Sequence, residues 1–336
     1  MEICYLLAFP DPHQGQAPPP EPFHGLKDAP YFQPVDIDLH TLGEEMFEIQ
    51  GKRITALRQR FDGQVQVAEF HFDLDAPFAA PALQARQQME LALKERTIPA
   101  QFRESGLFEE YHILLVREGK PSPEKWIDAH APALARFIRS QREFFDKTEI
   151  EESLSSRVRY SRADLTLVDW EGAVIIAPDG EFQSDIILLK IGNYQLLRYR
   201  MLDQSLETML DRIREEFLKN RKQPLLPGPT RNTIRQIIQH RLEIMLDFEH
   251  TEQNLLLIGD WYTAKLYATI RRELYLEEWK SAVRDKLDNL EGLIKTIQEN
   301  FSLTWSGLLE RVELAGWIIL LIGYFILFFM EIGIVK

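Results

Sequence analysis

The apolar and polar positions of the first 180 residues follow two periods in turn. Short apolar or alternating runs predict strands over residues 3–9, 64–74, 111–116, 164–168 and 173–177. The last two runs flank Asp169-Trp-Glu-Gly172, which is typical of a hairpin turn. Apolar residues at helical spacing predict helices over 81–96 and 123–144. This loose mixture fits an α+β or α/β fold, and we predict an α+β head domain that includes residues 1–150.

The following stretch turns helical. Residues 151–258 are expected to form the β-hairpin and a helical bundle, with helices over 184–195, 202–220 and 230–257. Residues 10–34 are rich in proline, so they are expected to form a long surface loop or a semi-rigid linker within the head domain.

Apolar residues between 260 and 312 repeat every seven positions in two rows. The rows are offset by four and then three residues, which is the a/d pattern of a coiled coil. We therefore expect a continuous helical stalk from Asp260, its N-cap, to residue 312. The rows can pair with another chain or with an earlier helix of the same chain, through Leu276, Val283, Leu287, Leu290, Ile294, Ile297, Phe301 and Leu308.

The last apolar stretch, Leu314 to Met330, carries no charge. A membrane-spanning helix needs roughly 20 apolar residues, and continuation to Val335 supplies them. We predict a transmembrane anchor over 314–335 that contacts the lipid bilayer; the alternative is a buried C-terminal core helix.

Charge and cysteine content narrow the function classes. The net charge of −13 argues against nucleic-acid binding, which needs phosphate-neutralising Lys and Arg. The single cysteine, Cys4, excludes an intramolecular disulfide and suggests a reducing compartment. The first ten residues lack the basic segment of a signal peptide. We therefore predict a tail-anchored membrane protein whose remaining part faces the cytoplasm.

No segment carries a motif specific enough to assign catalytic, cofactor-binding or metal-binding residues. Residues 240–250 place His240, Glu243, Asp247 and His250 on one helical face, which fits a metal site or, as we prefer, a solvated surface. Cys4 could also meet one of several histidines to form a nucleophile and base assembled in space: His24, His71, His112 or His130. Sequence spacing alone does not bring any of these pairs together.

The C-terminal half resembles the membrane-anchored "required for meiotic nuclear division" family. The similarity follows Trp170-Glu-Gly-Ala-Val-Ile-Ile, then Asp260-Trp261-Tyr262, then Lys286-Leu287 before the final apolar stretch. It implies membrane-tethered, oligomeric scaffolding, which mitochondrial members use in support of organellar translation, and it brings no catalytic residues. Because the chain lacks a transit peptide, a bacterial inner membrane is favoured over a mitochondrial one.

Three functions remain as hypotheses, of which the third is a regulatory subunit whose seam pairs with another membrane protein. The first is a non-enzymatic scaffold or tether that forms a homo-oligomer, or binds another membrane-associated protein, through its stalk. The alternative is a membrane-tethered enzyme with an active site in the α+β head. A deep pocket lined by convergent polar groups with shifted pKa values would favour the enzyme.

Overall fold

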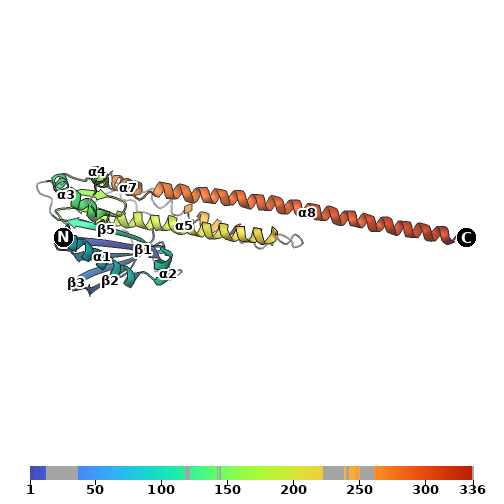
Figure 1. Cartoon of the computed structure of the whole chain (residues 1–336), viewed down its shortest axis with the longest axis horizontal. Helices are drawn as coiled ribbons and strands as arrows, with labels where there is room; N and C mark the ends of the chain where they lie inside the picture. The colour runs from blue at the N-terminus through green and yellow to red at the C-terminus, as the bar shows by residue number, and fades with distance from the viewer. Residues whose placement is uncertain are drawn as a thin grey trace. The chain divides into compact units, whose positions relative to one another are not determined.

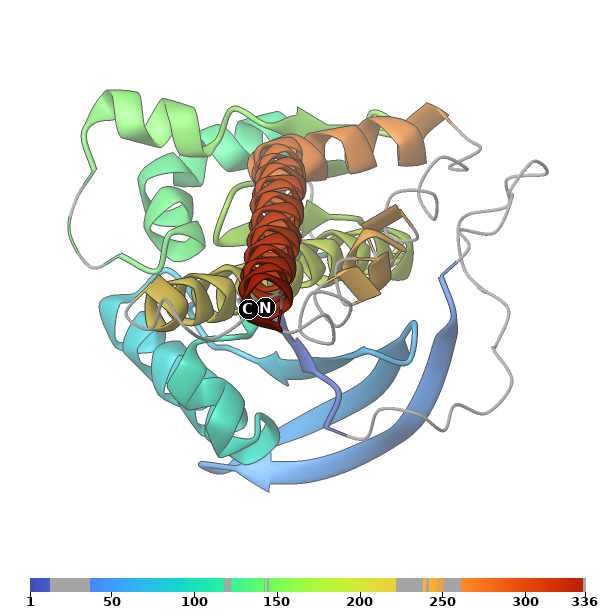
Figure 2. The same cartoon turned by 90° about the vertical axis from the view of Figure 1, so that its right-hand side faces the viewer.

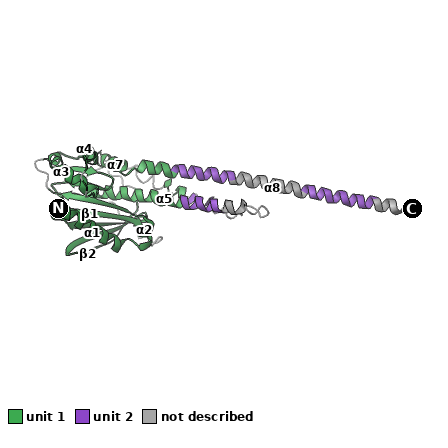
Figure 3. Ribbon diagram, viewed as in Figure 1, with its two compact units in different colours: residues 1–205, 244–283 green, residues 206–243, 284–336 purple. Residues whose placement is uncertain are grey.

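The computed structural model describes residues 1–12, 37–117, 122–141, 143, 145–221, 238–239, 242–246, 248–249 and 261–334. Within these, the side chains of residues 216–221, 297–312 and 329–334 are not described. The chain divides into two compact units (Figure 3): residues 1–205 with 244–283, and residues 206–243 with 284–336. The predicted domain bounds near 150, 258 and 312 stay a prediction. Residues 13–36, which hold most of the predicted proline-rich loop, lie outside the described residues.

One mixed sheet organises the first unit (Figure 1). Its strand order is β2-β3-β4-β1-β5-β8-β7-β6. The β5–β8 pair is parallel, and the other neighbouring pairs are antiparallel. The strands are β1 (Glu2–Pro10), β2 (Leu39–Ile49), β3 (Lys52–Phe61), β4 (Val65–Asp73), β5 (Glu109–Val116), β6 (Arg157–Val158), β7 (Leu165–Val168) and β8 (Gly172–Ile176).

Strand β1 lies between β4 and β5 and is buried on both faces. Its odd-numbered residues join one hydrophobic core with α1 (Ala80–Thr97) and α3 (Pro123–Ile138). Its even-numbered residues face the other way, toward α5 (Gln183–Arg221). The two views in Figures 1 and 2 agree that α1 and α5 lie on opposite sides of the strands. A strand covered on both faces reads as a continuous apolar run, which explains why residues 3–9 are recognisable in sequence.

Further helices with bounds in the described part of the chain are α2 (Ala100–Ser105), α4 (Lys147–Ser153), α7 (Trp261–Glu273) and α8 (Leu276–Ile334). Helix α4 begins with a capping box in which Asp146 and Glu149 bond each other's backbone amides. The predicted hairpin at residues 169–172 is confirmed, because β7 and β8 pair antiparallel across it.

The edge hairpin β2–β3 was not predicted. Most side chains of β2 are exposed on both faces and several are acidic, so no apolar alternation marks the strand. Gln50 and Gly51 both have positive φ angles, 53° and 75°, as a two-residue hairpin turn requires. Exposed charge on an edge strand also discourages pairing with other chains.

Two helix predictions were wrong in their boundaries. The segments predicted as separate helices over 184–195 and 202–220 form the single helix α5. The stalk predicted to be continuous from residue 261 to 312 is interrupted between α7 and α8, where Tyr275 has a φ of 51°. A left-handed residue cannot continue a right-handed helix, so the chain changes direction there.

The predicted transmembrane anchor was wrong, and with it the tail-anchored membrane location. Across the described parts of the chain, no helix is both long enough and apolar enough to cross a membrane.

The predicted seam residues are buried where their side chains are described. Leu276 and Val283 belong to the first unit, whereas Leu287, Leu290 and Ile294 belong to the second. Within the second unit, Lys286 Nζ on α8 lies 2.8 Å from Glu207 Oε1 on α5. Buried apolar residues flank this ion pair on α5: Leu206, Met209 and Ile213. The side chains of Ile297, Phe301 and Leu308 lie outside the description.

Helices α5 and α7 approach closely at Gly192. A Cβ there would lie 2.5 Å from Ile270 Cγ2 and 3.1 Å from Leu274 Cδ1. We expect Gly192→Ala to lower the free energy of unfolding by about 1–3 kcal/mol, because overpacking outweighs the helix propensity of alanine. Urea denaturation of the variant checks this.

Ile270→Ala removes the methyl group that a Cβ at residue 192 would meet, so it tests whether this contact causes the loss of stability. We expect the effects of Gly192→Ala and Ile270→Ala to be less than additive in the double variant. Gly292→Ala on α8 is the matched control, because a Cβ there meets nothing within 4 Å and should leave stability unchanged or raised. Additive losses would contradict the proposed contact.

Candidate functional site

A cavity of about 590 Å³ opens beside the N-terminal end of β5. Strand β8 begins at Gly172, opposite His112, so β5 extends beyond it toward Glu109. Groups from α1, α5 and the β7–β8 turn converge there. The lining residues are Tyr5, Gln87, Glu90, Leu91, Lys94, Phe108, Glu109, Glu110, His112, Ser140, Trp170, Glu171, Asn193, Leu196 and Leu274.

Glu90 is the most perturbed carboxyl group in this cavity. Burial raises its pKa to about 7, and the negative charge of Glu110 adds to the shift, although Arg86 and Lys94 oppose it. Arg86 Nε lies 3.2 Å from Glu90 Oε1. The same guanidinium donates to the carbonyl of Phe137 at 2.8 Å and to Ser140 Oγ at 2.6 Å. Arg86 is therefore held in place by several partners, and Glu90 is only partly compensated.

Glu110 connects strand β5 to helix α1 at the cavity wall. Its Oε2 accepts a hydrogen bond from Tyr5 OH at 2.7 Å and lies 3.1 Å from Lys94 Nζ. Lys94 also lies over the Phe108 ring, with 5.3 Å between Nζ and the ring centroid. Burial and the neighbouring Glu110 raise the pKa of Tyr5 far above its usual range, so its hydroxyl acts as a donor here.

The two remaining glutamates of the cavity also hold their protons more tightly than usual. Burial raises the pKa of Glu109 even though Arg200 of α5 forms an ion pair with it. Burial also raises the pKa of Glu171, and the negative charge of Asp169 contributes. Four carboxyl groups and one lysine thus line a single cavity, which makes it a favourable environment for a cation.

Steric contact with His112 explains why residue 172, at the start of β8, is a glycine. A Cβ on this residue would lie 2.6 Å from His112 Nε2 and 2.8 Å from the His112 carbonyl oxygen. His112 is buried and donates from Nε2 to the carbonyl of Phe137 at 3.0 Å. Burial, reinforced by the positive charge of Arg86, lowers its pKa well below the usual range. The imidazole is therefore a neutral wall of the cavity.

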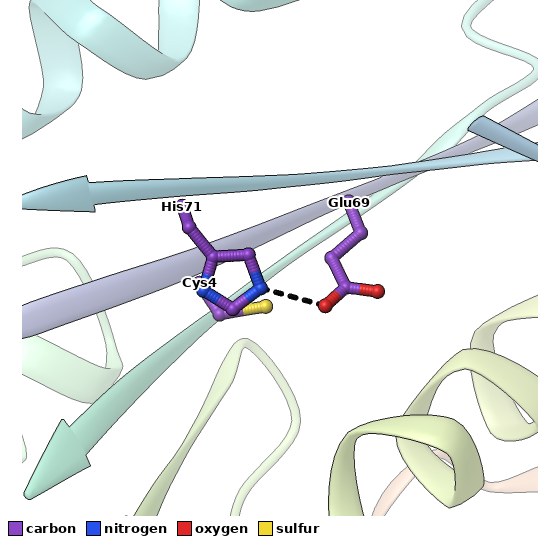
Figure 4. Close-up of side chains that lie close together, drawn as sticks. All are labelled: Cys4, Glu69 and His71. Atoms are coloured by element: carbon purple, nitrogen blue, oxygen red, sulfur yellow. Dashed lines mark hydrogen bonds and ion pairs between the residues drawn. The ribbon is translucent and has the colours of Figure 1, made fainter. Parts of the chain in front are cut away.

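A second polar cluster lies on the other face of the sheet (Figure 4). Cys4 on β1 pairs with His71 on β4 in register, and Glu69 lies two residues earlier on β4. The thiol sulfur, a ring nitrogen of His71 and a carboxylate oxygen of Glu69 all lie within 4.8 Å of one another. His71 Nε2 donates to Glu69 Oε1 at 2.6 Å, and Nδ1 donates to Glu2 Oε1 at 2.8 Å.

Opposite charges balance the carboxylates of this cluster. Lys190 of α5 forms an ion pair with Glu69 and donates to Gln59 Oε1 at 2.8 Å. Burial would raise the pKa of Glu69, but bonding to His71 and Lys190 outweighs it and lowers the pKa to about 2. Burial likewise opposes the charge of His71, yet its bonds to Cys4, Glu2 and Glu69 raise its pKa far above the usual range. Burial raises the pKa of Cys4 to about 11, so it carries a neutral thiol.

The structure brings together only one of the pairs considered from sequence. Cys4 meets His71, whereas His112 lines the cavity, His130 lies against Trp126 on α3, and His24 lies outside the described residues. Of the residues proposed for a metal face at 240–250, Glu243 is exposed and His240, Asp247 and His250 lie outside the description. The cavity glutamates were missed, because they come from separate elements and form no motif.

The raised pKa of Glu90 makes a prediction about stability. The pKa of Glu90 in the folded chain, about 7, exceeds the ordinary glutamate value of 4.5. Its contribution to the free energy of unfolding is therefore fully present below pH 4.5 and is lost as the pH rises through 7. The loss should be on the order of 2–3 kcal/mol. We expect Glu90→Gln to flatten the decline of the unfolding free energy between pH 5 and 8, measured by urea denaturation.

The slope of the unfolding free energy against pH is the quantity to compare. Its absolute value also changes in Glu90→Gln, because the variant lacks the ion pair with Arg86 at every pH at which Glu90 is ionised. Glu48→Gln on β2 is the matched control, since Glu48 is exposed and lies outside the cavity. Parallel curves for the wild type and Glu90→Gln would show that Glu90 does not titrate in this range.

Comparison with known proteins shows a similarity to one family of uncharacterized proteins. Residues 32–183 match the family described as "Uncharacterized protein MJ0711, N-terminal domain". The uncharacterized protein MJ0711 of Methanocaldococcus jannaschii is 24% identical over 193 residues, which cover 57% of this chain. The aligned part spans 59% of that relative's length. No solved structure matches the chain.

The resemblance to the "required for meiotic nuclear division" family was wrong. The matching family model begins at residue 32 and ends at residue 183, whereas the resemblance depended mainly on residues beyond 183 and on a membrane anchor. Nothing in the comparisons points to that family, so it lends no support to the scaffolding role, which stays a prediction. The chain is similar, from β2 to β8, to the N-terminal domain of uncharacterized protein MJ0711.

Proposed function

We propose that the first unit is a small-molecule-binding domain whose cavity takes a ligand with a cationic group and exchanges a proton through Glu90. This develops the enzymatic alternative from the sequence, without a membrane tether. One observation carries the proposal: four glutamates and one lysine line a cavity of about 590 Å³. Cavities of this size accommodate metabolites and cofactors.

The chemistry of the wall supports a cationic ligand over an anionic one. Partly buried carboxylates that repel one another gain free energy when an opposite charge enters between them. Phe108 and Trp170 also line the cavity, and aromatic faces attract ammonium and guanidinium groups. An anionic ligand would meet the same glutamates; Lys94 is the lysine of the lining, and Arg86 and Arg200 offset Glu90 and Glu109 from outside it.

Glu90 supplies the proton-transfer capacity. A carboxyl group with a pKa of about 7 is present in both protonation states at neutral pH, which suits a general acid or base. A ligand ammonium group beside Glu90 would favour the carboxylate form. Ligand affinity should therefore rise with pH as Glu90 ionises.

We expect small amines to bind the purified full-length chain. The panel consists of agmatine, putrescine and spermidine, with succinate as an anionic control, and isothermal titration calorimetry measures the affinities. Affinity should increase between pH 6 and pH 8. Glu171→Gln and Glu90→Gln should each weaken binding about ten- to a hundred-fold, which is the value of one charge-assisted contact.

Glu48→Gln serves again as the matched control and should bind as the wild type does. Equal affinity for succinate and the amines would contradict the cationic preference. Amine binding that survives both cavity substitutions would place the ligand elsewhere.

A second candidate function, self-association, is favoured by one feature of α8. Residues Trp317, Ile318, Ile319 and Leu320 are exposed by 67%, 51%, 69% and 68%. Consecutive helical residues point about 100° apart, so α8 presents apolar side chains on every side here. A single partner helix would cover only one stripe, and we therefore propose that three or more copies of this chain associate through residues 314–328.

Native mass spectrometry of the full-length chain tests self-association. We expect an assembly of three or more copies that dissociates in the double variant Ile319→Glu, Ile326→Glu, because buried carboxylates without partners are costly. Met46→Glu is the control, since Met46 is an exposed apolar residue on the edge strand β2. A wild-type monomer would contradict the assembly.

A further inference from the structure

The cluster of Cys4, Glu69 and His71 is independent of the cavity and of its proposed ligand. Two neighbouring strands bring the residues together on the face of the sheet that α5 covers. Figure 4 shows the sulfur, the ring nitrogen and the carboxylate oxygen pointing toward a common centre. The sulfur of Cys4 is fully buried, so it is poorly placed to act as a nucleophile on an external substrate.

The spacing of these atoms is close to that of a metal site. Zinc bonds to sulfur, nitrogen and oxygen at about 2.0–2.3 Å, which places tetrahedral ligand atoms roughly 3.3–3.7 Å apart. The three atoms here lie within 4.8 Å of one another, and a 2.6 Å hydrogen bond joins His71 to Glu69. Side-chain movements of about an ångström would convert the hydrogen-bonded cluster into a coordination shell.

The second ring nitrogen of His71 is already held as in many metal sites. Metal-binding histidines commonly donate their other N–H to a carboxylate, which fixes the ring orientation and strengthens the bond to the metal. Glu2 provides this acceptor at 2.8 Å from Nδ1, and Arg117 donates to the other oxygen of Glu2 at 3.2 Å. Nε2 therefore faces Cys4 and Glu69 in a defined orientation.

Proton release keeps the charge of the cluster balanced when a divalent cation binds. Binding would release the thiol proton of Cys4 and one ring proton of His71, so two positive charges leave as one doubly charged ion arrives. The net charge of the buried network is thus unchanged. Lys190 can remain on the second oxygen of Glu69, where it already forms an ion pair.

We infer that Cys4, Glu69 and His71 form a binding site for Zn²⁺, with Glu2 as the residue that positions His71. A thiolate and an imidazole favour zinc over calcium or magnesium, which prefer oxygen ligands. Three protein ligands leave a fourth coordination position for water or another small ligand. Access is through His71 and Glu2, whose side chains are partly exposed.

Metal reconstitution of the purified full-length chain tests this inference. The chain is treated with a chelator, dialysed, and then titrated separately with Zn²⁺ and with Co²⁺, whose spectrum reports on its ligands. We expect one equivalent of either metal to bind, with thiolate-to-cobalt charge-transfer absorption. Zn²⁺ should also raise the thermal unfolding midpoint, because it binds only the folded chain.

Cys4→Ala and His71→Gln should each abolish stoichiometric binding and the midpoint shift, whereas His130→Gln should bind as the wild type does. Circular dichroism establishes whether each variant is folded. If a variant does not fold, the cobalt spectrum of the wild type alone decides whether the thiolate of Cys4 binds the metal. Absence of the charge-transfer band in wild-type protein, or unchanged binding by folded Cys4→Ala, would overturn the site. Loss of metal in Glu90→Gln alone would instead place the ion in the cavity.

Discussion

The central position of β1 is the constraint on which the rest of the first unit depends. Strands β4 and β5 bond to both its edges, and helices cover both its faces. The alternation of side chains then sends Tyr5 toward the cavity and Cys4 toward the cluster with His71. Both candidate sites are therefore built on adjacent residues of one rigid strand, which is a favourable place to hold functional groups.

The first unit buries acidic groups in two different ways. Glu69 is surrounded by His71 and Lys190, so its charge is stabilised and its pKa falls. Glu90 has Arg86 nearby, but burial and Glu110 prevail and its pKa rises. The first arrangement is a complete network that a metal ion can enter only by replacing protons. The second is incomplete, which is why we assign it the ligand and the proton exchange.

Helix α8 raises a separate question, which is what covers the exposed apolar side chains of residues 314–328. The family match, residues 32–183, ends at the first residue of α5 and does not cover the C-terminal helices. Their function is therefore to be sought in the assembly state of the chain, and that of the sheet in its cavity and cluster.

The sequence alone determined the strands near residues 3–9, 64–74 and 111–116, the hairpin at 169–172 and helix α1, because burial on defined faces leaves a periodic pattern. It did not reveal β2, whose side chains are largely exposed, or β3, whose buried positions include the polar Gln59 and Arg60. It also did not reveal the interruption at Tyr275, whose φ angle no local pattern marks. It also led to a transmembrane anchor that the described residues do not contain. Only the tertiary structure placed Glu90, Glu110 and Glu171 around one cavity and Cys4 beside His71. These residues are far apart along the chain, and their proximity depends on strand order and register, which hydrophobic periodicity does not encode.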